Sequence, residues 1–210
     1  DLGDGVVCLE FHSKANSLDE GVLALLTETI DDFGDQYRAL VIGNDGPNFC
    51  VGANLAMLLE WCQAENWQRI EQGIVEVQTI FRTLRDLPKP TVAAVFGQTL
   101  GGGCELALYC DHVQAAAETY MGLVEVRAGL IPAGGGCTEM LRRHTAALEP
   151  NHDLNPPTRA LFERIGMAKV SNSAAEAREW KLLRPSDVIT MNRDRLLFDA
   201  RQAAHLLAST

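Results

Sequence analysis

The run TVAAVF (91–96) is the feature that most restricts the fold of this chain. Every residue after the threonine is apolar, so a strand formed here has to be covered on both faces. Comparable short runs occur in GVVCLEF (5–11), RALVIG (38–43) and HVQAAA (112–117), and segments with helical spacing separate them. Strands that alternate with helices predict an α/β protein with a mostly parallel sheet.

Apolar residues recur at helical intervals between and after these runs. The longest such segment, 67–84, ends before PKP (88–90), because proline has no N–H with which to continue a helix. The segment EPNHDLNPPT (149–158) is the predicted linker. It divides a core, 1–148, from a C-terminal helical region of the same domain, 149–210. Further helices are predicted at 20–33, 55–62, 103–110, 137–143, 158–167, 174–180 and 192–208.

The formal net charge is −10, and the Lys and Arg residues form no long run. Binding to nucleic acid or to a membrane surface needs concentrated positive charge, so the composition argues against both partners. No apolar run reaches the roughly 18–20 residues that a bilayer span requires. The chain begins at Asp1 without a methionine, which indicates a piece of a longer polypeptide.

The cysteines indicate a reducing environment. None belongs to a CxxC motif and most lie among apolar residues, so we expect buried free thiols and a cytoplasmic location. No His and Cys cluster has zinc spacing, and no metal site is predicted. The six positions are Cys8, Cys50, Cys62, Cys104, Cys110 and Cys137.

Three loops follow predicted strands: FCVGAN (49–54), QTLGGG (98–103) and MGLVE (121–125). In a parallel sheet, such loops gather at the edge formed by the carboxyl ends of the strands. We therefore expect all three to face one crevice.

The glycines of the second loop allow three interpretations. A dinucleotide site is disfavoured because GxGxxG is absent and Glu105 would meet the pyrophosphate. A serine hydrolase is disfavoured because no GxSxG occurs. The third interpretation is a pocket of N–H donors at a helix start, which holds an oxyanion beside a charged glutamate. Simple turn geometry explains the glycines equally well when they are taken alone.

The other two loops favour the third interpretation. An oxyanion hole usually takes two donors, and the glycine-bearing turn at 49–54 offers a second backbone amide. Glu125 offers a second carboxylate at the same edge, although a solvated surface glutamate is the ordinary alternative. Two carboxylates around one carbonyl can hold a water molecule or move a proton.

Together, FCVGANL, LGGGCELAL and MGLVEVRAGLIPAGGG resemble the crotonase (enoyl-CoA hydratase/isomerase) superfamily, in order and spacing, from about Gly5 to Leu207. Details such as AKVSNSAAEAR resemble the hydratase domain that follows the dehydrogenase in some bacterial 3-hydroxyacyl-CoA dehydrogenases. The resemblance implies the α/β ClpP/crotonase fold, a β-β-α spiral with two roughly perpendicular sheets. It also implies a C-terminal helical trimerisation region, a homotrimer or dimer of trimers, and a fused dehydrogenase domain.

The same resemblance implies enoyl-CoA hydratase activity in fatty-acid β-oxidation, on trans-2-enoyl-CoA thioesters. The amides of Val51 and Gly102 correspond to the oxyanion donors, and Glu105 and Glu125 to the two catalytic glutamates. No cofactor is implied, because coenzyme A is part of the substrate. Residues implied to contact substrate are Gly52, Ala53, Asn54, Gly101, Ala133, Lys14 and Asn16.

The sequence departs from the family pattern in places. The usual Ala-Gly-Ala-Asp is Val51-Gly52-Ala53-Asn54 here, which removes a charge, and Ala133 stands where glycine often follows a proline. Trp61 is expected to line the acyl pocket, whereas Trp67 is expected in the core. Two alternatives to a hydratase stay open: a Δ3-Δ2 enoyl-CoA isomerase, and a non-catalytic module that holds acyl-CoA for a fused dehydrogenase.

Overall fold

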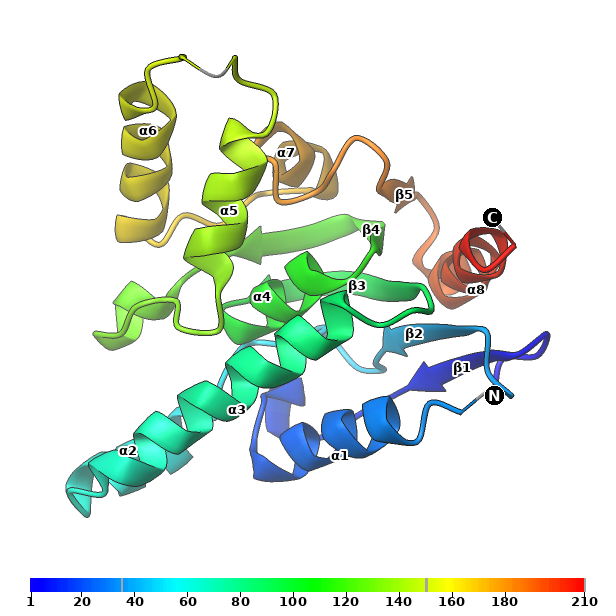
Figure 1. Cartoon of the computed structure of the whole chain (residues 1–210), viewed down its shortest axis with the longest axis horizontal. Coiled ribbons are helices and arrows are strands. Elements are labelled where there is room, and N and C mark those ends of the chain that lie inside the picture. The colour runs from blue at the N-terminus through cyan, green and yellow to red at the C-terminus, as the bar shows by residue number, and fades with distance from the viewer. Residues whose placement is uncertain (35, 150, 210) are drawn as a thin grey trace.

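The computed structural model describes residues 1–34, 36–149 and 151–209. Five parallel strands form one sheet, in which neighbouring strands follow the order of the chain (Figure 1). The predicted parallel α/β architecture is therefore confirmed, and the last strand was not predicted. The strands are β1 (Val6–Leu9), β2 (Ala39–Gly43), β3 (Thr91–Leu100), β4 (His112–Gly122) and β5 (Val188–Thr190).

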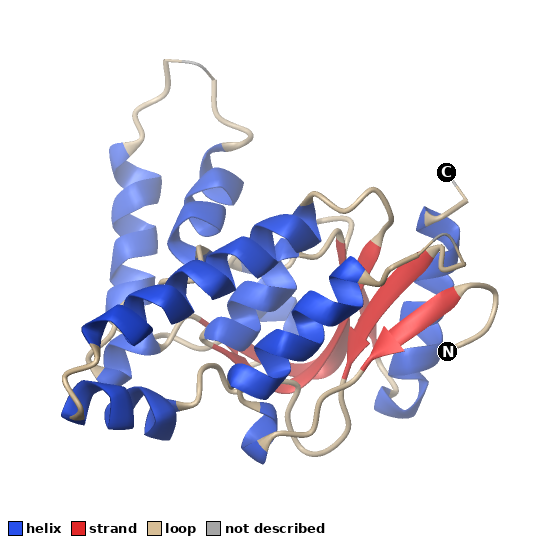
Figure 2. Ribbon diagram, turned by 60° about the horizontal axis from the view of Figure 1, so that its bottom comes forward, coloured by secondary structure: helices blue, strands red, loops and turns tan. Residues whose placement is uncertain are grey.

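The strand order explains where the helices lie. When crossovers of one hand join strands in sequential order, the crossover helices fall on the same face of the sheet. Figure 2 shows α1 and α3 on one side of the strands and α8 on the other. The helices are α1 (Glu20–Asp31), α2 (Leu55–Gln63), α3 (Trp67–Arg85), α4 (Gly102–Tyr109), α5 (Gly136–Thr145), α6 (Asn155–Gly166), α7 (Ala174–Glu179) and α8 (Leu196–Leu207).

The expectation of two perpendicular sheets is wrong for the part of the chain that the structure describes. Instead, β3 and β4 continue past their neighbours, with a register shift between Val95 and Gly97 at which β4 carries extra residues. Gly97 permits this bend because its φ is 54° and a β-carbon there would lie 2.3 Å from the Pro47 carbonyl oxygen. An isolated bridge between Cys50 and Thr99 accompanies the extended part.

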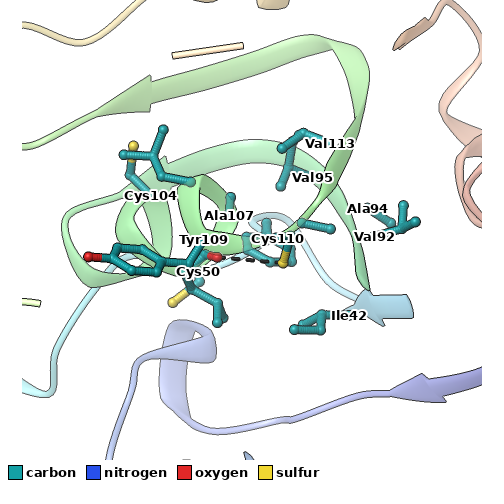
Figure 3. Packing of buried hydrophobic residues seen from close by; sticks show 14 of the residues in the cluster. Ile42, Cys50, Val92, Ala94, Val95, Cys104, Ala107, Tyr109, Cys110 and Val113 are labelled. Carbon is teal, nitrogen blue, oxygen red and sulfur yellow. Dashed lines mark hydrogen bonds between the residues drawn. The ribbon is translucent and has the colours of Figure 1, made fainter. Parts of the chain in front are cut away.

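The core lies where the central strands meet α4. Residues 91–96 are all buried, as the continuous apolar run predicts, and Figure 3 shows Val95 beside Val113 of the neighbouring strand. From Gly103 to Tyr109, every residue of α4 is buried. A carboxylate on a helix that is buried all round sits in an environment of lower dielectric constant than bulk water.

Other expectations need correction. Trp67, the first residue of α3, is 62% exposed rather than in the core. Cys62 and Cys137 are exposed, although all six cysteines are free as predicted. Within the predicted linker 149–158, α6 already begins at Asn155, since prolines suit the first turn of a helix; Pro150 lies outside the described residues.

The C-terminal region contributes to the sheet as well as to the helical layer. The strand β5 pairs with β4, and α8 packs across β1 to β4 through the buried Leu196, Ala200 and Ala204. The domain division at residue 148 stays a prediction. In the described part of the chain, no helix has the length and apolar character to cross a bilayer.

Candidate active site

A cavity of about 510 Å³ lies at the carboxyl edge of the central strands. Residues 51–53, 101–102 and 124–125 line it, so the structure brings together the three loops that the parallel topology places at one edge. The inner faces of α2 and α3 form the remaining wall. A cavity of this size and mixed lining is of the kind that binds small molecules.

Glu105 lies in the first turn of α4, where the aligned peptide dipoles favour a negative charge. Its side chain is buried and lines the cavity. Both carboxylate oxygens accept backbone N–H groups, from Gly136 at 2.8 Å and from Gly134 at 3.2 Å. Burial raises the pKa of Glu105, and these hydrogen bonds offset part of that rise. The carboxylate is therefore fixed in position and still accessible from the cavity.

The sequence analysis missed the donors at 134–136. The signal was present as AGGG (133–136), a second run of glycines before a helix. A β-carbon on Gly134 would lie 2.6 Å from Glu105 Oε2, and one on Gly136 would lie 2.9 Å from Glu105 Cγ. Only glycine lets this segment approach the glutamate closely enough to donate to it.

The carboxyl group of Glu125 differs from that of Glu105 in its hydrogen bonding. It begins the 3₁₀ helix Glu125–Ala128 just after β4, a helix that the sequence analysis did not predict. Both of its carboxyl oxygens are buried and have no hydrogen-bond partner among the described residues. Burial and the nearby charge of Glu105 raise the pKa of Glu125 to about 7. A proton is therefore available on this carboxyl at neutral pH, when Glu105 can carry the charge.

The amides of Val51 and Gly102 come close together where α4 meets the turn after β2. A β-carbon on Gly52 would lie 3.3 Å from the Gly102 nitrogen, so the two turns are in contact. Gly103 permits this approach, because a β-carbon there would lie 2.5 Å from the Cys50 carbonyl oxygen. Among the described residues, neither the Val51 nor the Gly102 nitrogen donates to a protein acceptor. Both amides are thus available to a ligand.

The remaining predicted contacts divide into two groups. The cavity lining includes Gly52, Ala53, Gly101 and Ala133, whose contact with substrate stays a prediction. Asn54 instead caps α2, and its side-chain oxygen accepts the backbone N–H groups of the first turn.

Two further predicted contacts, like Asn54, are not part of this cavity. Lys14 is exposed and does not line it. Asn16 is buried and donates to the carbonyl oxygens of Asp45 and Asn48, which holds that turn in place.

These features define what the site can do chemically. Two free amides can stabilise a negatively charged oxygen, while one carboxylate accepts a proton and a neighbouring carboxylic acid donates one. No group of three or more His, Cys, Asp or Glu residues with the arrangement of a metal site occurs within the described ranges.

The chain is similar to one family of known proteins and to several of its members. A profile of the enoyl-CoA hydratase/isomerase family matches residues 2–148. The "Probable 3-hydroxyacyl-CoA dehydrogenase" of Bacillus subtilis is 46% identical over all of this chain, which spans 26% of that protein. The mitochondrial methylglutaconyl-CoA hydratase of Rattus norvegicus is 35% identical over 69% of this chain, a match that covers 46% of that protein.

Solved structures extend the similarity to the whole fold. The crystal structure of an enoyl-CoA hydratase from Bacillus anthracis superposes with a TM-score of 0.79 at 26% identity, over 98% of this chain and 74% of that one. One from Polaromonas sp. JS666 gives 0.82 at 25% identity, with the same coverage. The chain belongs to the enoyl-CoA hydratase/isomerase family, the crotonase superfamily that its three loops predict. Its expected similarity to a bacterial 3-hydroxyacyl-CoA dehydrogenase is also confirmed.

Proposed function

We propose that this chain is an enoyl-CoA hydratase that adds water across the double bond of trans-2-enoyl-CoA thioesters. The observation that carries the proposal is the pairing of Glu105 and Glu125 in one cavity, beside two backbone amides with no protein acceptor. The two carboxyls differ in environment: one accepts two N–H groups and the other has no partner among the described residues. Such a difference separates a proton acceptor from a proton donor.

In the proposed reaction, the amides of Val51 and Gly102 bind the thioester oxygen. Glu105 takes a proton from water as the water oxygen forms a bond to the β-carbon. The electrons of the double bond move toward the thioester oxygen, where the two amides stabilise the negative charge. Glu125 then donates its proton to the α-carbon on the same face, which gives a 3-hydroxyacyl-CoA. Ala133, at the rim of the cavity, is a candidate for holding the water through its amide.

The family context supports a role beside a dehydrogenase. The Bacillus subtilis relative is named a 3-hydroxyacyl-CoA dehydrogenase, and the product of the proposed hydration is the substrate class of that name. We place the chain as the hydratase part of such a longer protein, in fatty-acid β-oxidation. Assembly as a trimer or a dimer of trimers through the C-terminal helices, and a cytoplasmic location, stay predictions.

The test is turnover of crotonyl-CoA, followed as loss of the absorbance of the conjugated enoyl thioester. Glu105→Gln and Glu125→Gln should each lower kcat by about 10²–10⁴-fold, because each removes one proton-transfer group. Glu118→Gln, an exposed glutamate on β4, is the matched control and should leave kcat unchanged.

Other outcomes separate the alternatives. If the wild type and both active-site variants behave alike, the chain is a non-catalytic acyl-CoA module. If it converts a 3-enoyl-CoA but adds no water to crotonyl-CoA, it is an isomerase, which needs only one proton-shuttling carboxylate.

A further inference from the structure

The cavity extends from the two glutamates along one face of α3. Val77, Ile74, Gly73 and Ile70 line it, and their spacing places them on the same side of the helix. The Val77 end is the reacting end, because the adjacent Gln78 donates to the Ala133 carbonyl oxygen at 2.7 Å. The next residue, Gly134, donates its backbone N–H to Glu105.

The helix α2 covers this groove. It lies beside the first half of α3, away from the sheet (Figures 1 and 2), and none of its residues is buried. Met57, Leu58 and Trp61 line the cavity from this side. The apolar face of α2 therefore covers the cavity, whereas the apolar face of an ordinary core helix packs against other side chains.

Trp61 stands at the far end of the groove and is held from two sides. The Arg69 guanidinium carbon lies 4.7 Å from the centre of its ring, a cation–π contact. A β-carbon on Gly73 would lie 3.5 Å from the ring, so the ring packs directly on the bare backbone of α3. A glycine in a helix interior is destabilising, and seating the tryptophan gives this one a structural reason.

Charge at the far end favours an uncharged occupant. Arg69 is an ion-pair partner of Glu20 at 2.7 Å and of Glu76 at 3.3 Å, so two carboxylates surround its one positive charge. Arg127, the other cation among the described lining residues, donates to the Ala168 carbonyl oxygen. Both arginines already have protein partners, so neither is free to bind a carboxylate at the end of a ligand.

We propose that the groove binds an uncharged acyl tail and that Trp61 is the end wall that limits its length to about eight carbons. From Val77 to Gly73, where the Trp61 ring packs, α3 rises about 6 Å, which holds roughly five carbons at about 1.3 Å each, beyond the thioester carbon and the reacting pair. The inference rests on the function proposed above and names its substrate class.

Binding of saturated acyl-CoAs with four to sixteen carbons, measured by calorimetry, tests the end wall independently of catalysis. Affinity for the wild type should rise about fourfold for each added methylene until about eight carbons and then stop rising. In Trp61→Ala, the rise should continue to about eleven carbons, because α3 rises about 10 Å between Val77 and Ile70, the lining residue beyond the ring.

Trp67→Ala is the matched control, because Trp67 is exposed and does not line the cavity. It should keep the wild-type limit. A ligand of equal length that ends in a carboxylate should bind at least tenfold more weakly than its methyl-ended counterpart.

The inference is overturned if wild-type affinity rises steadily to sixteen carbons, or if Trp61→Ala keeps the wild-type limit. Turnover of trans-2-enoyl-CoAs by the wild type decides the proposed function separately. A protein that binds with the predicted length limit but turns nothing over would contradict the hydratase and leave the end wall intact.

Discussion

Glu105 and Glu125 show how one residue type takes two roles. The first lies at a helix start and accepts two backbone N–H groups, while the second begins a 3₁₀ helix after β4 and accepts none from the described residues. Because the side chains themselves are identical, their protonation depends on burial, on the neighbouring charge and on the hydrogen bonds that each carboxyl accepts. The unpartnered carboxyl is also a cost to the fold, as is common for catalytic groups.

Because the charged Glu125 destabilises the fold, Glu125→Gln should raise the free energy of unfolding by an amount that depends on pH. Burial and Glu105 raise the pKa of Glu125 from 4.5 to about 7, so the folded state binds more protons than the unfolded state between these values. Wild-type stability should therefore fall as pH rises through this window. At pH 8 the variant should gain about 1–2 kcal/mol in the free energy of unfolding, after allowance for solvent screening, and little at pH 4.

Denaturant unfolding of wild type and Glu125→Gln at the two pH values measures this difference. Glu118→Gln serves again as the exposed control and should not change with pH in this way. An equal gain for Glu125→Gln at pH 4 and pH 8 would mean that the charge of Glu125 is not what destabilises the fold.

At the scale of elements, the approach of α4 to the turn after β2 creates the pair of free amides. Gly103 is what allows it, since a β-carbon there would lie 2.5 Å from Cys50 atoms. The first N–H groups of a helix have no intrahelical acceptor, so this geometry directs an unused donor into the cavity. The site thus depends on a close contact between two segments about 50 residues apart in the chain.

Gly103→Ala should separate these segments, because the new β-carbon would lie 2.5 Å from Cys50 atoms. We expect a loss of about 1–3 kcal/mol in stability from overpacking. We also expect kcat to fall by up to about 10²–10³-fold, since an oxyanion donor moves out of place. Steady-state turnover of crotonyl-CoA and denaturant unfolding measure the two effects.

Gly166→Ala is the matched control, because nothing lies within 4 Å of a β-carbon at this helical position. It should leave turnover unchanged and stabilise α6 slightly. Normal kcat in Gly103→Ala would show that the close contact is not needed to position the amides.

At the scale of the whole molecule, a buried carboxylate joins the elements that hold the site. Glu139 of α5 has a fully buried side chain and pairs with Arg85 of α3 and with Arg142 and Arg143 of its own helix. Arg143 also donates to the Leu108 carbonyl oxygen at the end of α4. This cluster ties α3, α4 and α5 together one turn away from Glu105.

Glu139→Gln should lower the free energy of unfolding by about 3–5 kcal/mol at pH 7, because it leaves the buried Arg143 without its carboxylate partner. Burial raises the pKa of Glu139, but hydrogen bonds from Arg142 and Arg143 outweigh this and lower it overall. The stabilisation is therefore present above the ordinary glutamate pKa and is lost as pH falls below it.

Denaturant unfolding across pH 3–7 checks this expectation. Glu163→Gln removes an exposed ion pair with Arg159 and should cost less than about 1 kcal/mol. Similar losses in the two variants would show that the buried cluster contributes no more than a surface pair.

Local patterns predicted much of the fold and part of the site. Continuous apolar runs predicted the central strands, because burial on both faces requires them, and the parallel order then predicted that the three loops meet. Trp67 was placed wrongly because apolar spacing along α3 cannot show where the helix leaves the sheet layer. The second sheet was expected from the resemblance, whereas the bend at Gly97 depends on contact with a distant turn.

The sequence by itself determined the alternation of strands and helices, the sheet edge that carries the site, and the two glutamates with their flanking glycine turns. These follow from hydrophobic periodicity and backbone freedom, which act over a few residues. Only the tertiary structure decided that Gly134 and Gly136 donate to Glu105, that Glu125 lacks a partner in the described chain, and that Trp61 closes the groove. Those outcomes depend on burial and on contacts between distant segments, which no local pattern contains.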